Sequence, residues 1–214
     1  MGKAITKILI ADDHELVRRG LQDILEEAFP NLKIGHAADG RQLLDAVRRQ
    51  QWDLVLLDIN MPGRSGLEIL QELKQLHPEM PVVILSMLPE KDYAMRALRG
   101  GAAGYVSKQS AASELLLATR KALAGGRYIT PSLAETLAAS VAGEAPTYPH
   151  ELLSNRELQV LRLVANGSTV KEIAAELALS EKTIGTYRTR ISQKLHLNTN
   201  VELARYAARH NLVD

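Results

Sequence analysis

Three carboxylates follow two apolar runs in the N-terminal part of the chain. Ile8-Leu9-Ile10-Ala11 is followed by Asp12 and Asp13, and Leu54-Val55-Leu56-Leu57 is followed by Asp58. Short apolar runs that are rich in β-branched residues and bounded by turn residues are typical of buried parallel strands. Ligands of such sheets bind at the carboxyl ends of the strands, so we expect the three acids to lie together there. Crowded carboxylates repel one another and need a cation, which favours a divalent metal with oxygen ligands, most simply magnesium.

Two further polar side chains follow later runs of the same kind. Ser86 comes after Val82-Val83-Ile84-Leu85, and Lys108 comes shortly after the run 103–106. If these runs are strands of the same sheet, both side chains join the carboxylates at one edge. Asp58 can then attack phosphorus as a nucleophile, while Lys108 offsets charge on the transferred group and Ser86 donates a hydrogen bond to it. The five side chains together indicate phosphoryl chemistry.

The elements that must position these side chains alternate regularly from the N-terminus to about residue 124. Apolar runs of strand length are each followed by a segment with helical spacing, and Gly and Pro mark the breaks. The expected strands are 6–11, 32–38, 53–57, 81–85 and 103–106, and the expected helices are 14–28, 40–50, 66–76, 90–99 and 111–124. This pattern predicts an α/β domain at residues 1–124, with a parallel sheet covered on both faces and right-handed connections.

The composition is that of an ordinary globular protein. Of 214 residues, 46% are hydrophobic and 24% are charged. The sequence contains no cysteine, which excludes disulfides and thiolate metal sites and fits a reducing compartment. No apolar stretch approaches the roughly 20 residues that span a bilayer, so we expect a cytoplasmic protein without a membrane partner. The net charge of +1 is too small to indicate nucleic-acid binding by itself.

Residues 125–150 are expected to link two domains. Pro131 can start a short helix, since apolar residues follow it at helical spacing. Gly143, Pro146 and Pro149 then end the pattern. We expect a short linker helix and a flexible tether, with the domain boundary near residue 147.

Beyond residue 150 the pattern is entirely helical. Four residues that can cap a helix precede four amphipathic segments; they are Ser154, Thr169, Ser180 and Thr199. Short helices with tight connections predict a compact all-α domain of four helices at residues 151–214. The second and third helices, with a turn at 178–180, have the arrangement of a helix-turn-helix.

The third of these helices, at about 181–195, has a basic outer face. Four basic residues against one acid, Glu181, give an excess of +3; they are Lys182, Arg188, Arg190 and Lys194. Hydroxyl and aromatic side chains between them can reach phosphates and base edges, as a helix in the DNA major groove requires. For the charge alone, a solvated helix surface is the simpler explanation.

Residues 6–124 resemble the receiver domain of two-component response regulators. The resemblance rests on the acidic pair, on Leu56-Leu57-Asp58 with Met61-Pro62-Gly63, and on a hydroxyl residue and a lysine in the family's order. It implies a flavodoxin-like (βα)5 fold with a five-stranded parallel sheet, and Asp58 as phosphoacceptor. The implied magnesium ligands are Asp12, Asp13, Asp58 and the Asn60 backbone carbonyl; the implied switch pair is Ser86 with Tyr105; and the implied salt-bridge lysine is Lys108.

Each of these residues also has an ordinary interpretation when taken alone. Asp13 could cap a helix or join an ion pair, Lys108 could be a surface lysine, and Tyr105 could pack in the core. His14 is expected to begin a helix rather than to bind the metal. Because all of these residues match the receiver family together and in the right order, the functional interpretation is favoured over the separate ordinary ones. In the implied switch, the Ser86 hydroxyl moves toward the phosphoryl group and the Tyr105 ring turns inward.

Residues 151–213 resemble the LuxR-type DNA-binding domain. The resemblance rests on Leu153-Ser154-Asn155-Arg156-Glu157, Lys171-Glu172-Ile173-Ala174, Thr183-Ile184 and Lys194-Leu195, in this order. The implied base-reading positions are Gly185, Thr186 and Thr189; backbone contacts are expected from Lys182, Thr183, Tyr187, Arg188 and Lys194; and dimer contacts are expected from Val201, Ala204, Arg205 and Ala208. Because Gly185 stands where lysine is frequent in the family, the preferred base sequence does not follow from the resemblance.

Together the two halves resemble a response regulator of the NarL/FixJ type. Such a protein is expected to accept a phosphoryl group on Asp58 from a sensor histidine kinase, and so to change its domain docking, dimerisation and DNA binding. One alternative is a DNA-binding regulator that works without phosphorylation. A weaker alternative is a phosphatase of the haloacid-dehalogenase kind, which needs a second Asp two residues after the nucleophile, where this chain has Asn60.

Overall fold

The computed structural model of the protein describes residues 5–88, 90–141 and 148–213, and the chain divides into two compact units. The first unit comprises residues 1–143 and the second comprises residues 144–214. Among the described residues, none of the helices is long and apolar enough to cross a bilayer.

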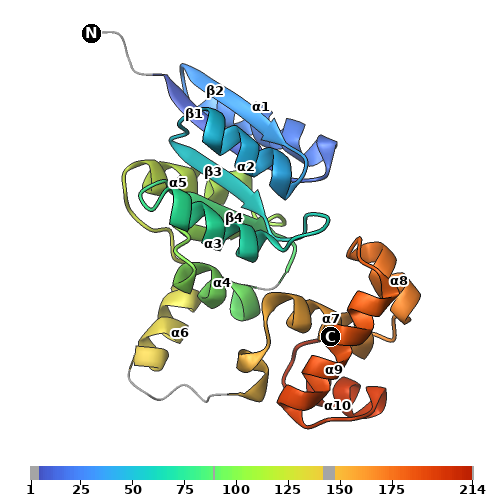
Figure 1. The fold of residues 1–214 in the computed structure, drawn as a ribbon. Coiled ribbons are helices and arrows are strands. Elements are labelled where there is room, and N and C mark those ends of the chain that lie inside the picture. Colours follow the sequence, from blue (N-terminus) through green and yellow to red (C-terminus); the bar gives the residue numbers. More distant parts are fainter. Residues whose placement is uncertain (1–4, 89, 142–147, 214) are drawn as a thin grey trace. The chain divides into compact units, whose positions relative to one another are not determined.

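The first unit contains a five-stranded parallel sheet (Figure 1). Its strands are β1 (Thr6–Ala11), β2 (Leu32–Ala37), β3 (Leu54–Asp58), β4 (Val82–Ser86) and β5 (Gly104–Ser107). They lie side by side in the order β2-β1-β3-β4-β5, with every neighbouring pair parallel. This is the strand order of the flavodoxin-like fold, whose ligands bind where the order reverses, between β1 and β3. The predicted fold class is confirmed.

Five helices connect the strands: α1 (Glu15–Ala28), α2 (Gly40–Arg49), α3 (Gly66–Leu76), α4 (Glu90–Arg99) and α5 (Ala112–Leu123). Contacts pair α1 with α5, and α3 with both α2 and α4, so the helices form two layers that cover the two faces of the sheet. Because the central strands β3 and β4 are buried on both faces, they are apolar at nearly every position. Each predicted boundary of these five strands and five helices lies within one residue of the observed one.

The segment after α5 is attached to the same unit. Tyr128 forms a parallel bridge with Gly104 at the edge of the sheet, and its N–H donates to the Ala103 carbonyl at 2.7 Å. The predicted linker helix is present as α6 (Pro131–Val141), and it contacts α4. The first part of the predicted linker therefore packs on the sheet domain. The expected boundary near residue 147 lies outside the described residues.

The second unit is helical. A 3-10 turn, η1 (Pro149–Leu152), precedes α7 (Asn155–Ala165), α8 (Val170–Glu176), α9 (Glu181–Leu195) and α10 (Asn200–Arg209). Each predicted cap accepts a backbone N–H at its helix start, and Ser154, Thr169 and Thr199 each form a complete capping box. The inner side of α9 consists of Ile184, Ile191 and Leu195, which are all buried. The four predicted helices are confirmed; the 3-10 turn was not predicted.

Candidate functional site

Lys108 and two carboxylates form the centre of the site at the carboxyl edge of the sheet. The Lys108 Nζ lies 2.5 Å from Asp12 Oδ2 and 2.7 Å from Asp58 Oδ2. Asp12 and Asp58 stand at the ends of the neighbouring strands β1 and β3, and they are only 1% and 2% exposed. Lys108 follows β5 directly, and its N–H donates to the carbonyl of Ser86, the last residue of β4. Three strand ends therefore bring together side chains that are distant in sequence, as the sequence predicted.

Burial and charge oppose each other in this group. Burial raises the pKa of the Asp58 carboxyl above its ordinary value, although the Lys108 ammonium and the Asn60 N–H, which donates to Oδ1 at 3.1 Å, counteract it. For Lys108, burial lowers the pKa of the ammonium, but the Asp58 and Asp12 carboxylates outweigh burial and the net shift is upward. The Lys108 side chain is therefore favoured in its charged form, whereas burial makes the charged form of Asp58 less favourable.

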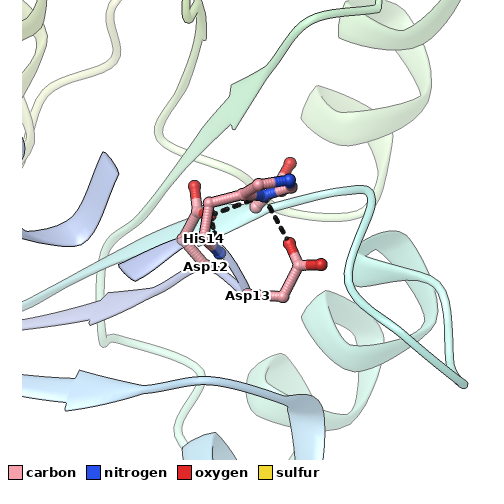
Figure 2. A group of neighbouring side chains, drawn as sticks. Asp12, Asp13 and His14 are labelled. Carbon is pink, nitrogen blue, oxygen red and sulfur yellow. Dashed lines mark hydrogen bonds and ion pairs between the residues drawn. The ribbon is translucent and has the colours of Figure 1, made fainter. Parts of the chain in front are cut away.

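Asp13 and His14 complete the acidic cluster on the loop after β1. Figure 2 shows the His14 ring beside the carboxylates of Asp12 and Asp13, with its Nδ1 at 3.4 Å and 2.9 Å from their Oδ1 atoms. His14 is the N-cap residue of α1, as predicted, and its backbone N–H donates to Asp12 Oδ1 at 2.8 Å. The loop therefore turns both carboxylates toward the end of β3, where Asp58 stands.

The donor set fits a divalent cation. Oxygen atoms of Asp12, Asp13 and Asp58 lie within 4.8 Å of one another, together with a ring nitrogen of His14. Carboxylate oxygens are the ligands that Mg2+ prefers, and a spread of no more than 4.8 Å is small enough for one ion to contact all three carboxylates after small side-chain movements. In addition, Asp13 Oδ1 is buried and, apart from the ion-pair contact with His14 Nδ1 at 2.9 Å, has no hydrogen-bond partner among the described residues. A hard cation would satisfy that oxygen.

The loop between β3 and α3 is folded tightly against the phosphoacceptor candidate. The Gly66 N–H donates to the Ile59 carbonyl at 2.9 Å, and Ser65 caps α3. A Cβ at position 66 would lie 2.3 Å from the Asp58 carbonyl oxygen and 2.7 Å from the Ile59 Cα. Only glycine lets α3 begin this close to the end of β3.

We expect Gly66→Ala to destabilise the first unit by about 1–3 kcal/mol, because the new methyl group would displace backbone next to Asp58. Gly20→Ala is the matched control, since a Cβ at this exposed position in α1 meets nothing within 4 Å. That substitution is expected to raise stability by about 0.5–1 kcal/mol. Urea unfolding of both variants measures the difference, and equal effects of the two substitutions would contradict this account of the loop.

Both predicted switch side chains are tied to Leu88. The Ser86 Oγ accepts the Leu88 N–H at 3.0 Å, and the Tyr105 hydroxyl donates to the Leu88 carbonyl at 2.6 Å. The Tyr105 ring is 1% exposed, so it already lies inward. The resemblance to receiver domains implied this inward position for the phosphorylated state. At the start of α4, the Glu90 carboxylate accepts the Thr130 hydroxyl at 2.8 Å. Leu88 thus contacts both switch side chains, and Glu90 contacts the segment that precedes α6.

The outer face of α9 is the candidate nucleic-acid interface. Its buried side faces the other helices of the unit, while Lys182, Gly185, Thr186 and Thr189 are exposed. These four positions fall at intervals of three, one and three residues, so they share one face of the helix. The predicted base-reading residues are therefore all on the accessible side.

Two family descriptions match the chain. The response regulator receiver domain matches residues 8–120, and the luxR family of bacterial regulatory proteins matches residues 151–207. The response regulator GacA of Pseudomonas syringae pv. syringae strain B728a is 39% identical over 209 residues, 97% of this chain and 98% of the relative. The response regulator UvrY of Escherichia coli K12 is 36% identical over 206 residues, 96% and 94% of the two chains. This chain belongs to the response regulators of the NarL/FixJ type.

Solved structures agree with this assignment. The structure of RcsB from Salmonella enterica serovar Typhimurium bound to the promoter rprA in the presence of the phosphomimetic BeF3− has a TM-score of 0.63 and 27% identity. The match covers 96% of this chain and 99% of that chain. The receiver and the helical output domain of the response regulator thus both have solved counterparts.

In this response regulator, two of the predicted DNA-backbone residues have partners within the domain. The Lys194 Nζ lies 2.6 Å from the Oε2 of Glu157, a buried residue of α7, and donates to the Leu152 carbonyl at 3.1 Å. Arg188 donates to the Asn200 side chain at the start of α10. Neither contact was predicted from the sequence, because only the fold brings these residues together. The DNA contacts of Lys194 and Arg188 stay predictions.

The predicted dimer contacts of the response regulator lie on one face of α10. Val201 is 68% exposed, Arg205 and Ala208 are exposed, and Ala204 is half-buried. Leu203 and Ala207 point to the core instead. The helix thus presents a mostly apolar outer stripe, and its role as a dimer contact stays a prediction.

Proposed function

We propose that this response regulator accepts a phosphoryl group on Asp58 from the phosphohistidine of a sensor histidine kinase, and that the phosphorylated form binds DNA through α9. The position of Lys108 supports this most directly, since its ammonium lies between the Asp12 and Asp58 carboxylates. A buried ammonium beside a nucleophilic carboxylate can offset the charge of an incoming phosphoryl group. Family membership makes phosphorylation control the normal expectation.

In the transfer, a carboxylate oxygen of Asp58 forms a bond to phosphorus while the P–N bond of the donor phosphohistidine breaks. The imidazole leaves with the electron pair of that bond and takes up a proton. Asp12, Asp13, Asp58 and the Asn60 carbonyl would hold Mg2+, which when bound supplies charge that offsets the phosphoryl oxygens. Lys108 keeps its ion pair with Asp12 as it turns toward the new phosphoryl group. The receiver acts only on its own phosphoryl group and turns over no external substrate.

The signal would leave the site through the loop between β4 and α4. A phosphoryl oxygen that accepts a hydrogen bond from the Ser86 hydroxyl draws Ser86 away from the Leu88 N–H. Leu88 is also the acceptor of Tyr105, and Glu90 binds Thr130 of the linker. A shift of this loop therefore changes the contacts of the segment that leads to the output domain.

The proposed target is double-stranded DNA in the cytoplasm. In a related solved structure RcsB is bound to a promoter, which supports the same class of ligand for this chain. We propose that phosphorylation favours a homodimer, through α10 or the receiver, which would bind paired half-sites. The residues proposed to contact the backbone are Lys182, Thr183, Tyr187, Arg188 and Lys194.

Incubation of the full chain with a small phosphodonor tests the phosphoacceptor chemistry. With Mg2+ we expect intact-mass spectrometry to show one added phosphoryl group per chain, lost on treatment with hydroxylamine as an acyl phosphate should be. With EDTA in place of Mg2+ we expect a much slower reaction, because the three carboxylates then lack their cation. Equal rates with and without the metal would contradict the proposed metal site.

The same experiment separates the two alternatives. A regulator that works without phosphorylation would show no label under any condition. A phosphatase would release phosphate from phosphomonoesters with repeated turnover, which the Asn60 position argues against. We expect a single stable label and no turnover of phosphomonoesters.

A further inference from the structure

Two threonines on the exposed face of α9 bind their own helix. The Thr186 hydroxyl donates to the Lys182 carbonyl at 3.1 Å, and the Thr189 hydroxyl donates to the Gly185 carbonyl at 3.1 Å. A hydroxyl has one hydrogen to donate, so neither side chain can also donate to a base without losing its intrahelical bond. What each exposed threonine offers a ligand is its methyl group and the remaining acceptor capacity of its oxygen.

The centre of the same face has no side chain. Gly185 is exposed, and a Cβ there would meet nothing within 4 Å. The Lys182 side chain stands one turn before it, and Thr186 and Thr189 follow. The face therefore allows close approach of a surface to the helix and presents two methyl groups to it.

We propose that α9 reads thymine through the methyl groups of Thr186 and Thr189, an inference that rests on the proposed DNA binding. In the major groove only thymine presents a methyl group, and it is read by apolar contact. Guanine presents only hydrogen-bond acceptors there, so it must be read by a donor. The hydroxyl hydrogens of these two threonines are already engaged with backbone carbonyls of the helix. Gly185 lets the helix come close enough for methyl–methyl contact.

Uracil substitution tests the proposal, because uracil lacks only the thymine methyl group. The probe is a duplex that the phosphorylated full chain selects from a random pool, remade with deoxyuridine at one thymine at a time. Loss of one buried methyl contact is expected to weaken wild-type binding about fourfold at each thymine that is read. The Thr186→Ser and Thr189→Ser variants keep the hydroxyl and lose the methyl group, so each should bind thymine and uracil duplexes equally at its own position.

Thr136→Ser is the matched control. Thr136 is exposed in α6, outside the helical domain, and its hydroxyl donates to the Ser132 carbonyl at 3.1 Å, so the same chemical change is made in the same local setting. This variant should keep the full response to uracil.

The outcomes separate this inference from the function on which it rests. Binding of no duplex at all, phosphorylated or not, would overturn the proposed DNA binding. A selected duplex whose affinity is unchanged by every uracil substitution would overturn thymine reading alone. A uracil response that is the same in wild type, Thr186→Ser and Thr189→Ser would assign the thymine contact to other residues and would also overturn it.

Discussion

The Asp58→Asn variant is expected to take up no phosphoryl group and to be more stable than the wild type. An amide oxygen is a poor nucleophile toward phosphorus, and the site loses one of its anionic ligands. The stability gain follows from the raised pKa of the buried Asp58 carboxyl. An acid whose pKa is higher in the folded than in the unfolded state costs stability once the pH exceeds its unfolded value, so at neutral pH a neutral side chain removes that cost.

Urea unfolding in EDTA at pH 7, with phosphorylation followed by mass spectrometry, checks both parts of this prediction. Asp45→Asn is the matched control, because Asp45 is half-exposed on α2 and is not a member of the acidic cluster. We expect it to phosphorylate normally and to change stability by less than about 0.5 kcal/mol. A labelled Asp58→Asn variant would refute the assignment of Asp58, and a less stable one would refute the account of its burial.

The Lys194→Met variant is expected to lose about 2 kcal/mol of stability in the helical domain. Removing the lysine leaves the buried Glu157 carboxylate without its ammonium partner, with the Ser154 N–H as a remaining donor at 2.7 Å. A fully buried pair would lose about 3–5 kcal/mol, but the Lys194 side chain is 38% exposed and the effect is smaller. Amide hydrogen exchange in α7 and α9 measures the loss, and Lys182→Met, on the exposed face of α9, is the control.

The effect of this substitution should depend on pH. Burial raises the pKa of the Glu157 carboxyl, but hydrogen bonds from Lys194 and Ser154 outweigh burial and lower it below its ordinary value. An acid with a lowered folded pKa adds stability that is present above its unfolded pKa of about 4.3 and is lost as the pH falls below that value. The difference between wild type and Lys194→Met should therefore be largest at neutral pH and shrink at about pH 3. A difference that grows on acidification would contradict the ion pair.

The convergence of the charged residues and Ser86 at the receiver site could be predicted from local sequence because each of them stands at the end of a strand. Asp12, Asp58, Ser86 and Lys108 each follow an apolar run, and parallel strands bring such ends to one edge. The helix starts were equally visible, since capping residues and the spacing of apolar residues are local signals.

Other features depend on tertiary structure and carried no local signal. Glu157 completes the capping box of α7, which depends on local sequence, but its ion-pair partner Lys194 is 37 residues away and meets it only in the folded domain. The buried ring of Tyr105 is a matter of side-chain rotamer, which a sequence pattern does not specify. Tyr128 was expected to lie in the linker, but its bridge with Gly104 attaches this part of the chain to the edge of the sheet.

The central claim is that a phosphoryl group on Asp58 changes the affinity for DNA. The most direct test compares the full chain before and after phosphorylation, on one selected duplex at one salt concentration, for wild type and for Asp58→Asn. We expect phosphorylated wild type to bind about tenfold more tightly, within the usual range of coupling between two sites, and Asp58→Asn to be unchanged by the phosphodonor. Equal affinity of the two forms of the wild type, or the same rise in Asp58→Asn, would contradict the account.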